Sequence, residues 1–124
     1  MEFDETSNRV IGCAIEVHRT LGPGLIESVY RRCLEHELHL AGLAFESEKC
    51  VEVCYKGIRL DGPNLRVDLI IEDILIVELK VVDKLLPVHE AQLLTYMRLT
   101  GCRIGLLINF DCRSIKEGLK RFVL

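Results

Sequence analysis

Two apolar runs near the middle of the chain, residues 67–71 and 74–82, have the pattern of buried β-strands. The polar pair Glu72-Asp73 between them has the length of a tight hairpin turn, although it lacks the favoured Asn-Gly or Asp-Gly sequence. Because side chains alternate along a strand, one face of the second run carries Ile74, Ile76, Glu78 and Lys80, and the other carries Leu75, Val77, Leu79 and Val81. Both faces are mostly apolar, so the pattern predicts a central strand that ends in two charged side chains.

Apolar residues at helical spacing predict three helices around these strands. The first begins at one of the capping residues at positions 4, 6 and 7, and the Gly-Pro-Gly segment 22–24 separates it from the second, which covers about residues 25–41. The third covers about residues 88–100 and ends at Gly101.

Further strands are predicted at residues 49–56, 104–110 and 119–124, with a turn-rich connection over residues 57–64. The elements follow the order α-α-β-β-β-α-β-β. This order predicts an α/β (α+β) fold, with a mixed central β-sheet flanked by helices and one domain over residues 1–124.

The composition is typical of a folded globular protein, since 49% of the 124 residues are apolar and 28% are charged. No apolar run approaches the ~20 residues of a membrane span, and the acidic opening MEFDETSNR does not resemble a signal peptide. We therefore expect a cytoplasmic protein with no membrane contact. The net charge of −3 argues against a general nucleic-acid coat, although a bound divalent ion would reverse the local field around acidic ligands.

Six cysteines are present, and none of them forms a CxxC pair. In a reducing compartment the expectation is free, mostly buried thiols. Cys50 and Cys54 share a face of a predicted strand, and His36 and His39 lie one helical turn apart, which leaves a zinc or iron–sulfur site as an alternative. The usual ligand spacing of such sites is missing, so a redox or metal-storage protein is the remote alternative.

The charged residues of the central strands suggest a chemistry. Asp68 lies near the start of the first run, and Glu78 and Lys80 lie near the end of the second. Buried charges are costly unless they are paired, hydrated or used. Two carboxylates at the ends of neighbouring strands can hold Mg²⁺, and an ammonium beside them can position a water molecule, which suits phosphodiester hydrolysis. Alternating charges on an exposed strand would produce the same spacing.

Several segments resemble one known family. GLIESVY, with Gly24, Glu27 and Tyr30, resembles the motif that names the GxxExxY family. VELKVVDKLLPVHEAQLLTYMRLTG and IGLLINF also resemble that family, and the similarity covers about residues 11–123. The family is placed in the PD-(D/E)XK nuclease-like superfamily. The resemblance implies a restriction-endonuclease-like core and a Mg²⁺ or Mn²⁺ cofactor.

The resemblance also implies roles for individual residues. Asp68 and Glu78 match the metal ligands, and Lys80 matches the catalytic lysine. Glu27 matches an acidic residue that helps to hold metal or water, although a favourable first-turn acid is the simpler interpretation. Gln92 and Tyr96, spaced Q-x-x-x-Y, resemble a motif found beside the metal site in some nucleases, with an ordinary surface polar residue as the alternative interpretation of Gln92.

Three further residues are candidates for substrate binding. Tyr96, one helical turn after Gln92, can face the sheet with it, or be an ordinary core aromatic residue. His89 could contact a phosphate or be a structural surface residue. Arg66 could pair with Asp68 or contact the substrate. Val67 stands where the superfamily's name has proline, at a position known to be degenerate.

Two functions remain open at this point. The first is a metal-dependent nuclease that acts on nucleic acid, with DNA as the expected substrate. The second is a catalytically silent nuclease-like module that binds nucleic acid or a protein partner. A chain of this size contacts few phosphates, which favours a homodimer that presents two sites.

Overall fold

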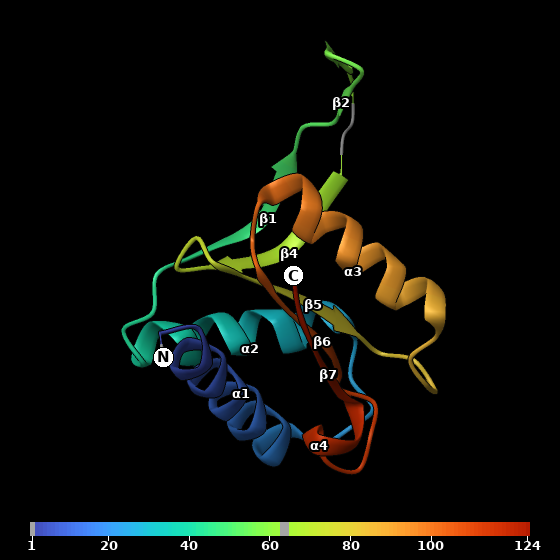
Figure 1. Cartoon of the computed structure of the whole chain (residues 1–124). Coiled ribbons are helices and arrows are strands. Elements are labelled where there is room, and N and C mark those ends of the chain that lie inside the picture. Colours follow the sequence, from blue (N-terminus) through green and yellow to red (C-terminus); the bar gives the residue numbers. More distant parts are fainter. Residues whose placement is uncertain (1, 63–64) are drawn as a thin grey trace.

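A five-stranded mixed sheet forms the centre of the structure (Figure 1). The computed structural model describes residues 2–62 and 65–124. The strands lie in the order β1 (Phe45–Val51), β4 (Leu65–Ile71), β5 (Leu75–Lys80), β6 (Ile104–Asn109) and β7 (Leu119–Val123). β5 and β6 run parallel, and the other neighbouring pairs run antiparallel. The predicted mixed sheet is confirmed.

Helices cover both faces of the sheet, as Figure 1 shows. α1 (Glu2–Leu21) and α2 (Glu27–Leu40) pack on one face, against a core cluster that includes Leu75, Val77 and Leu79. α3 (Pro87–Thr100) packs on the other face, where Ile76 meets Leu93 and Met97. The predicted alternation of side chains along β5 is therefore correct, and it explains why this strand is buried on both sides.

The predicted hairpin between β4 and β5 forms through a two-residue turn. Glu72 and Asp73 both have positive φ values, 54° and 57°, and the Ile74 N–H donates to the Ile71 carbonyl at 3.1 Å. This is the backbone that two-residue hairpins prefer, reached here without glycine. The Glu72 N–H donates to the Ala44 carbonyl at 2.9 Å, and the Glu72 carboxylate accepts the Ala44 N–H at 2.6 Å. These bonds help to stabilise the left-handed conformation.

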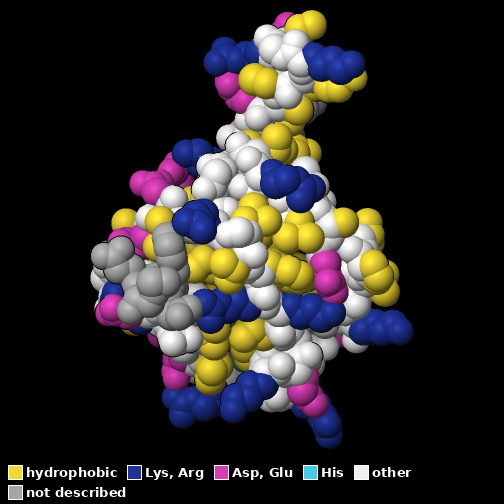
Figure 2. Space-filling model, viewed as in Figure 1, with side chains coloured by type: hydrophobic (Ala, Val, Ile, Leu, Met, Phe, Trp, Pro, Cys, Tyr) yellow, Lys and Arg dark blue, Asp and Glu magenta, His cyan; other side chains and the backbone are white. Residues whose placement is uncertain are grey.

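The predicted strand at residues 49–56 is wrong in its bounds. β1 runs from Phe45 to Val51, and the chain then leaves the sheet. β2 (Cys54–Tyr55) and β3 (Ile58–Arg59) form a separate two-stranded ribbon, which projects from the rest of the molecule in Figures 1 and 2. The alternation of residues 49–56 fits one long strand as well as the ends of two separate strands. It also does not indicate which strand each of them pairs with.

Two other elements differ from expectation. α1 begins at Glu2, so positions 4, 6 and 7 lie inside the helix and do not cap it. The short helix α4 (Ile115–Gly118), which precedes β7, was not predicted. It has only one turn, too short to show helical periodicity.

The six cysteines are free, as expected, but they are not mostly buried. Cys13 and Cys102 are buried, whereas Cys50 and Cys54 are exposed. Among the described residues, no helix is both long and apolar enough to cross a membrane.

Candidate active site

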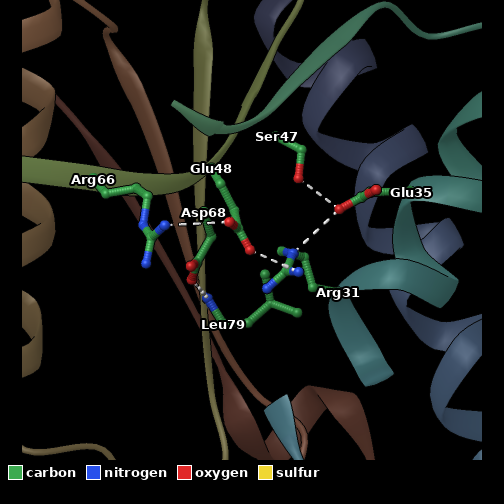
Figure 3. Close-up of polar contacts among 7 residues, drawn as sticks. All are labelled: Arg31, Glu35, Ser47, Glu48, Arg66, Asp68 and Leu79. Atoms are coloured by element: carbon green, nitrogen blue, oxygen red, sulfur yellow. Dashed lines mark hydrogen bonds and ion pairs between the residues drawn. The ribbon is translucent and has the colours of Figure 1, made fainter. Parts of the chain in front are cut away.

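The site lies where β4 and β5 begin to separate. Backbone pairing runs from Ile71 and Leu75 to Leu69 and Val77. Beyond this pair, the two strands are joined by hydrogen bonds between the backbone of one strand and a carboxylate side chain of the other. The Asp68 N–H donates to Glu78 Oε1 at 3.0 Å, and the Leu79 N–H donates to Asp68 Oδ2 at 2.8 Å; Figure 3 shows the second contact. Each carboxyl group is thus held by the neighbouring strand and keeps a second oxygen outside this contact.

Burial and the contact between the two carboxyl groups shift their ionisation. Glu78 is only 5% exposed, and its burial, together with the charge of Asp68, raises its pKa to about 8. Burial also raises the pKa of the half-buried Asp68, against the opposing effects of the Leu79 N–H and the Lys80 charge. A cation beside Glu78 would offset the charge of Asp68, which helps to raise the pKa of Glu78.

Glu27 joins this group from the first residue of α2. Although the residue is exposed, the protein around its carboxyl group and the nearby Asp68 charge raise its pKa, while Lys80 and Arg31 act in the opposite direction. Glu27, Asp68, Glu78 and Lys80 therefore interact electrostatically, although they come from three elements of the fold. Glu27 thus lies near the predicted site, but Glu27, Asp68 and Glu78 are not grouped so that all three could hold one metal ion, as the resemblance had implied.

Tyr30 fixes the loop that leads into Glu27. Its ring is fully buried and stacks on Phe110, with ring centroids 4.7 Å apart. Its hydroxyl donates to the Gly22 carbonyl at 2.5 Å and accepts the Leu25 N–H at 3.2 Å. Gly24 within this loop has φ 103°, a conformation that favours glycine. Two of the three residues of the GxxExxY pattern thus shape the backbone that presents the third.

Gln92 and Tyr96 reach the site from α3. Lys80 Nζ donates to Gln92 Oε1 at 3.3 Å, and the side chains of Gln92 and Tyr96 are hydrogen-bonded to each other. Tyr96 is buried, and this burial, together with the charge of Glu78, raises its pKa. The predicted Q-x-x-x-Y pair therefore connects the lysine to the core beneath α3.

His89 and Arg66 make their contacts elsewhere. His89 Nδ1 accepts the Leu86 N–H at 3.0 Å, which caps the start of α3. Arg66 pairs with Glu48, at 3.3 Å between Nη1 and Oε2, instead of with Asp68. The suggested pairing of Arg66 with Asp68 is therefore not found, and a phosphate contact of His89 stays a prediction.

Sequence reasoning missed Arg31 and Glu48. Arg31 bridges Glu48 at 2.7 Å and Glu35 at 3.2 Å, and its charge lowers the pKa of both Asp68 and Glu27 (Figure 3). Arg31 lies four residues after Glu27, so helical spacing could have placed it on the same face. No spacing or residue pattern in the sequence placed Glu48 near the site.

The donor set fits a hard divalent cation. Asp68 and Glu78 supply carboxylate oxygens, which Mg²⁺ and Mn²⁺ prefer. Within residues 2–62 and 65–124, no three His, Cys, Asp or Glu side chains are grouped so that they could hold a metal ion. A cation held by one or two carboxylates would complete its coordination with water and substrate phosphate, as Mg²⁺ usually does.

The mixed sheet flanked by helices is consistent with a restriction-endonuclease-like fold, and the carboxylates and lysine lie at its central strands. A family model for the PD-(D/E)XK nuclease superfamily matches residues 4–122, and the chain belongs to this superfamily. Searches of curated proteins and of solved structures returned no match. The narrower GxxExxY resemblance stays a prediction.

Proposed function

We propose that this chain is a divalent-metal-dependent nuclease that hydrolyses phosphodiester bonds in DNA. The observation that carries the proposal is the pairing of Asp68 and Glu78, two adjacent carboxyl groups in a largely buried position beside Lys80, where the charge of Asp68 disfavours the ionisation of Glu78. A purely structural role does not require this arrangement, because an uncompensated buried charge destabilises a fold. Membership of the nuclease superfamily supports the same reaction.

Asp68 and Glu78 would hold the metal ion, and Glu27 would contribute through a water molecule. When bound, a divalent ion lowers the pKa of a coordinated water and polarises the phosphate. The raised pKa of Glu78 means that it must release a proton to bind metal near neutral pH. Metal affinity should therefore increase as the pH rises.

Lys80 is the proposed catalytic residue that orients the attacking water and offsets the negative charge that develops on the phosphate. Gln92 accepts a hydrogen bond from Lys80 and is a positioning residue for it. Tyr96 in turn supports Gln92. A homodimer with two such sites is part of the proposal, and sedimentation velocity would report about twice the 14.1 kDa of one chain.

The first experiment is calorimetric titration of Mn²⁺ into the wild type and into Asp68→Asn. We expect binding by the wild type and its loss in the variant. Glu46→Gln, which changes an exposed carboxylate on β1, is the matched control and should bind as the wild type does. Absence of binding by the wild type, even with DNA present, would favour the catalytically silent binding module.

The second experiment measures cleavage of nicked, branched and single-stranded DNA with Mg²⁺. Lys80→Ala should reduce the rate by at least about 100-fold while metal binding persists, because it removes a charge needed in the transition state. Lys116→Ala, an exposed lysine on α4, should leave the rate unchanged. Equal activity of the two variants would reject Lys80 as a catalytic residue.

A further inference from the structure

A carboxylate is held between two arginines next to the candidate metal site. Glu48 Oε1 lies 2.7 Å from Arg31 Nη2, and Glu48 Oε2 lies 3.3 Å from Arg66 Nη1 (Figure 3). The register of β1 on β4 pairs Ser47 with Leu69 and Lys49 with Val67, so Glu48 lies opposite Asp68. The three charged groups come from α2, β1 and β4 and meet beside the proposed metal ligand.

The backbone at Glu48 is unusual for a strand. Its φ is 50°, in the left-handed region that residues other than glycine rarely occupy. A residue in this conformation departs from the regular alternation of β1. Such strained positions are concentrated at functional sites, where the surrounding structure stabilises them.

The charges around Arg31 show that Glu48 is not needed to neutralise it. Arg31 already pairs with Glu35 at 3.2 Å, and Ser47 donates a hydrogen bond to the same Glu35 oxygen at 2.6 Å. Arg66 is 64% exposed, and an exposed ion pair of this kind contributes little to stability. Without Glu48, Arg31 would keep its ion pair with Glu35, whereas the ion pair of Arg66 with Glu48 would be lost, so the guanidinium of Arg66 could bind another anion.

We propose that Arg31 and Arg66 form a binding subsite for a backbone phosphate of the nucleic acid next to the scissile phosphate, and that Glu48 occupies this subsite in the free protein. A guanidinium pair can bind phosphate oxygens as it binds the oxygens of a carboxylate. Arg31 is 18% exposed and its side chain is tied to α2 by Glu35, so its position is set before the ligand arrives. The inference rests on the proposed function because it takes nucleic acid as the ligand.

The test is binding of a short fluorescein-labelled DNA duplex in EDTA, followed by fluorescence anisotropy, so that neither metal binding nor cleavage contributes. Glu48→Gly removes the competing carboxylate and suits the left-handed backbone, and it should tighten binding roughly 3- to 10-fold. Arg66→Ala should weaken binding by a similar factor and reduce the salt dependence by about one phosphate contact. In the double variant Glu48→Gly/Arg66→Ala, the increase in DNA affinity caused by Glu48→Gly should be smaller.

Arg31→Lys tests the other arginine of the subsite. It keeps the charge but loses the planar guanidinium, so it should weaken binding without unfolding the protein.

The ribbon offers a matched control. Arg59 and Glu52 form another exposed pair, at 3.0 Å, with exposed fractions of 68% and 57%. Glu52→Gly and Arg59→Ala measure the effect of changing surface charge alone. The subsite is rejected if Glu48→Gly tightens binding no more than Glu52→Gly, if Arg66→Ala behaves as Arg59→Ala, or if no variant binds DNA.

The proposed function and the subsite can fail separately. Tighter DNA binding by Glu48→Gly without Mg²⁺-dependent cleavage by the wild type would support the subsite and reject the nuclease. Cleavage by the wild type, with Glu48→Gly equal to Glu52→Gly in binding, would support the nuclease and reject the subsite.

Discussion

Asp68 and Glu78 accept backbone N–H groups from each other's strands, and this contact keeps two carboxyl groups close together. The backbone hydrogen bonds stabilise the ionised forms. Burial disfavours the ionisation of both groups, and the charge of Asp68 also disfavours the ionisation of Glu78. For Glu78 the disfavouring effects are larger, since its pKa rises from the ordinary 4.5 to about 8. The metal-free site therefore destabilises the fold whenever both groups are ionised.

A pH dependence of stability follows from this shift. Between about pH 4.5 and pH 8, the folded protein binds more protons at Glu78 than the unfolded chain does, so the contribution of this group to stability falls as the pH rises. Glu78→Gln cannot ionise and should lack this fall. In EDTA, urea unfolding should find the variant more stable than the wild type by about 1–3 kcal/mol at pH 8 and by much less at pH 5, given about 1.4 kcal/mol per tenfold change in ionisation.

Glu46→Gln serves as the control for this measurement, because the carboxylate at position 46 is exposed and pairs with Lys49 on the surface. Its free energy of unfolding should stay within about 0.5 kcal/mol of the wild type at every pH. If the stability of Glu78→Gln follows the wild-type pH profile in parallel, Glu78 does not titrate in this range.

At the level of single residues, the sequence was informative where residue type and spacing carry the chemistry. Asp68, Glu78 and Lys80 stand out because charged side chains are rarely buried, and these three lie within apolar runs. The partner of Arg66 could not be predicted in the same way. Glu48 reaches it from a left-handed backbone conformation, and nothing in the residues around position 48 requires that conformation.

At the level of elements, periodic segments were predicted well and short elements were not. β5, β6 and α3 have clear patterns because each buries one or two faces in the core. The ribbon of β2 and β3 buries little, and its partner choice depends on the turn at Lys56 and Gly57, where both φ values are positive. The pattern of residues 49–56 does not distinguish one strand from two short ones.

Replacement of two glycines by alanine is expected to change the free energy of unfolding in opposite directions. A Cβ on Gly118, at the end of α4, would lie 2.3 Å from the backbone oxygen of Asn109, so either strand β6 or the turn must move. Gly118→Ala should therefore destabilise the protein by about 1–3 kcal/mol. Gly12, exposed inside α1, has open space around its Cβ position, and Gly12→Ala should stabilise by about 0.5–1 kcal/mol.

Thermal unfolding of the two variants beside the wild type gives the comparison. Both replace glycine by alanine, so the change in the conformational entropy of the unfolded chain is similar and the difference reports the native contacts. A Gly118→Ala protein as stable as Gly12→Ala would mean that the connection from α4 to β7 adapts without cost.

At the level of the whole molecule, the apolar core and the candidate site occupy different regions of the fold. The apolar core lies on both sides of β5 and β6, whereas the ribbon projects outside it (Figure 2). Tyr55 and Ile58 on the ribbon, and Leu60 next to it in sequence, are exposed. β1 and β4 connect the two regions, because the ribbon continues from the ends of these strands at Val51 and Leu65. The candidate site, at Asp68 on β4, lies between the buried centre of the sheet and the projecting ribbon.

Native-state hydrogen exchange should show different local stabilities for the central strands and for the ribbon. Amides of β5 and β6 are bonded within a sheet buried on both faces, so they should exchange only through global unfolding. Amides of β2 and β3 belong to an isolated two-stranded ribbon, which is marginally stable in water, and they should exchange orders of magnitude faster. Low concentrations of urea should steeply increase the exchange rates of the β5 and β6 amides and leave those of the ribbon amides nearly unchanged. Only global unfolding exposes much surface, and urea acts in proportion to the surface exposed. Ribbon amides as slow as those of β6 would mean that the ribbon is held by contacts beyond one chain, as a second copy packed against its apolar side chains would provide.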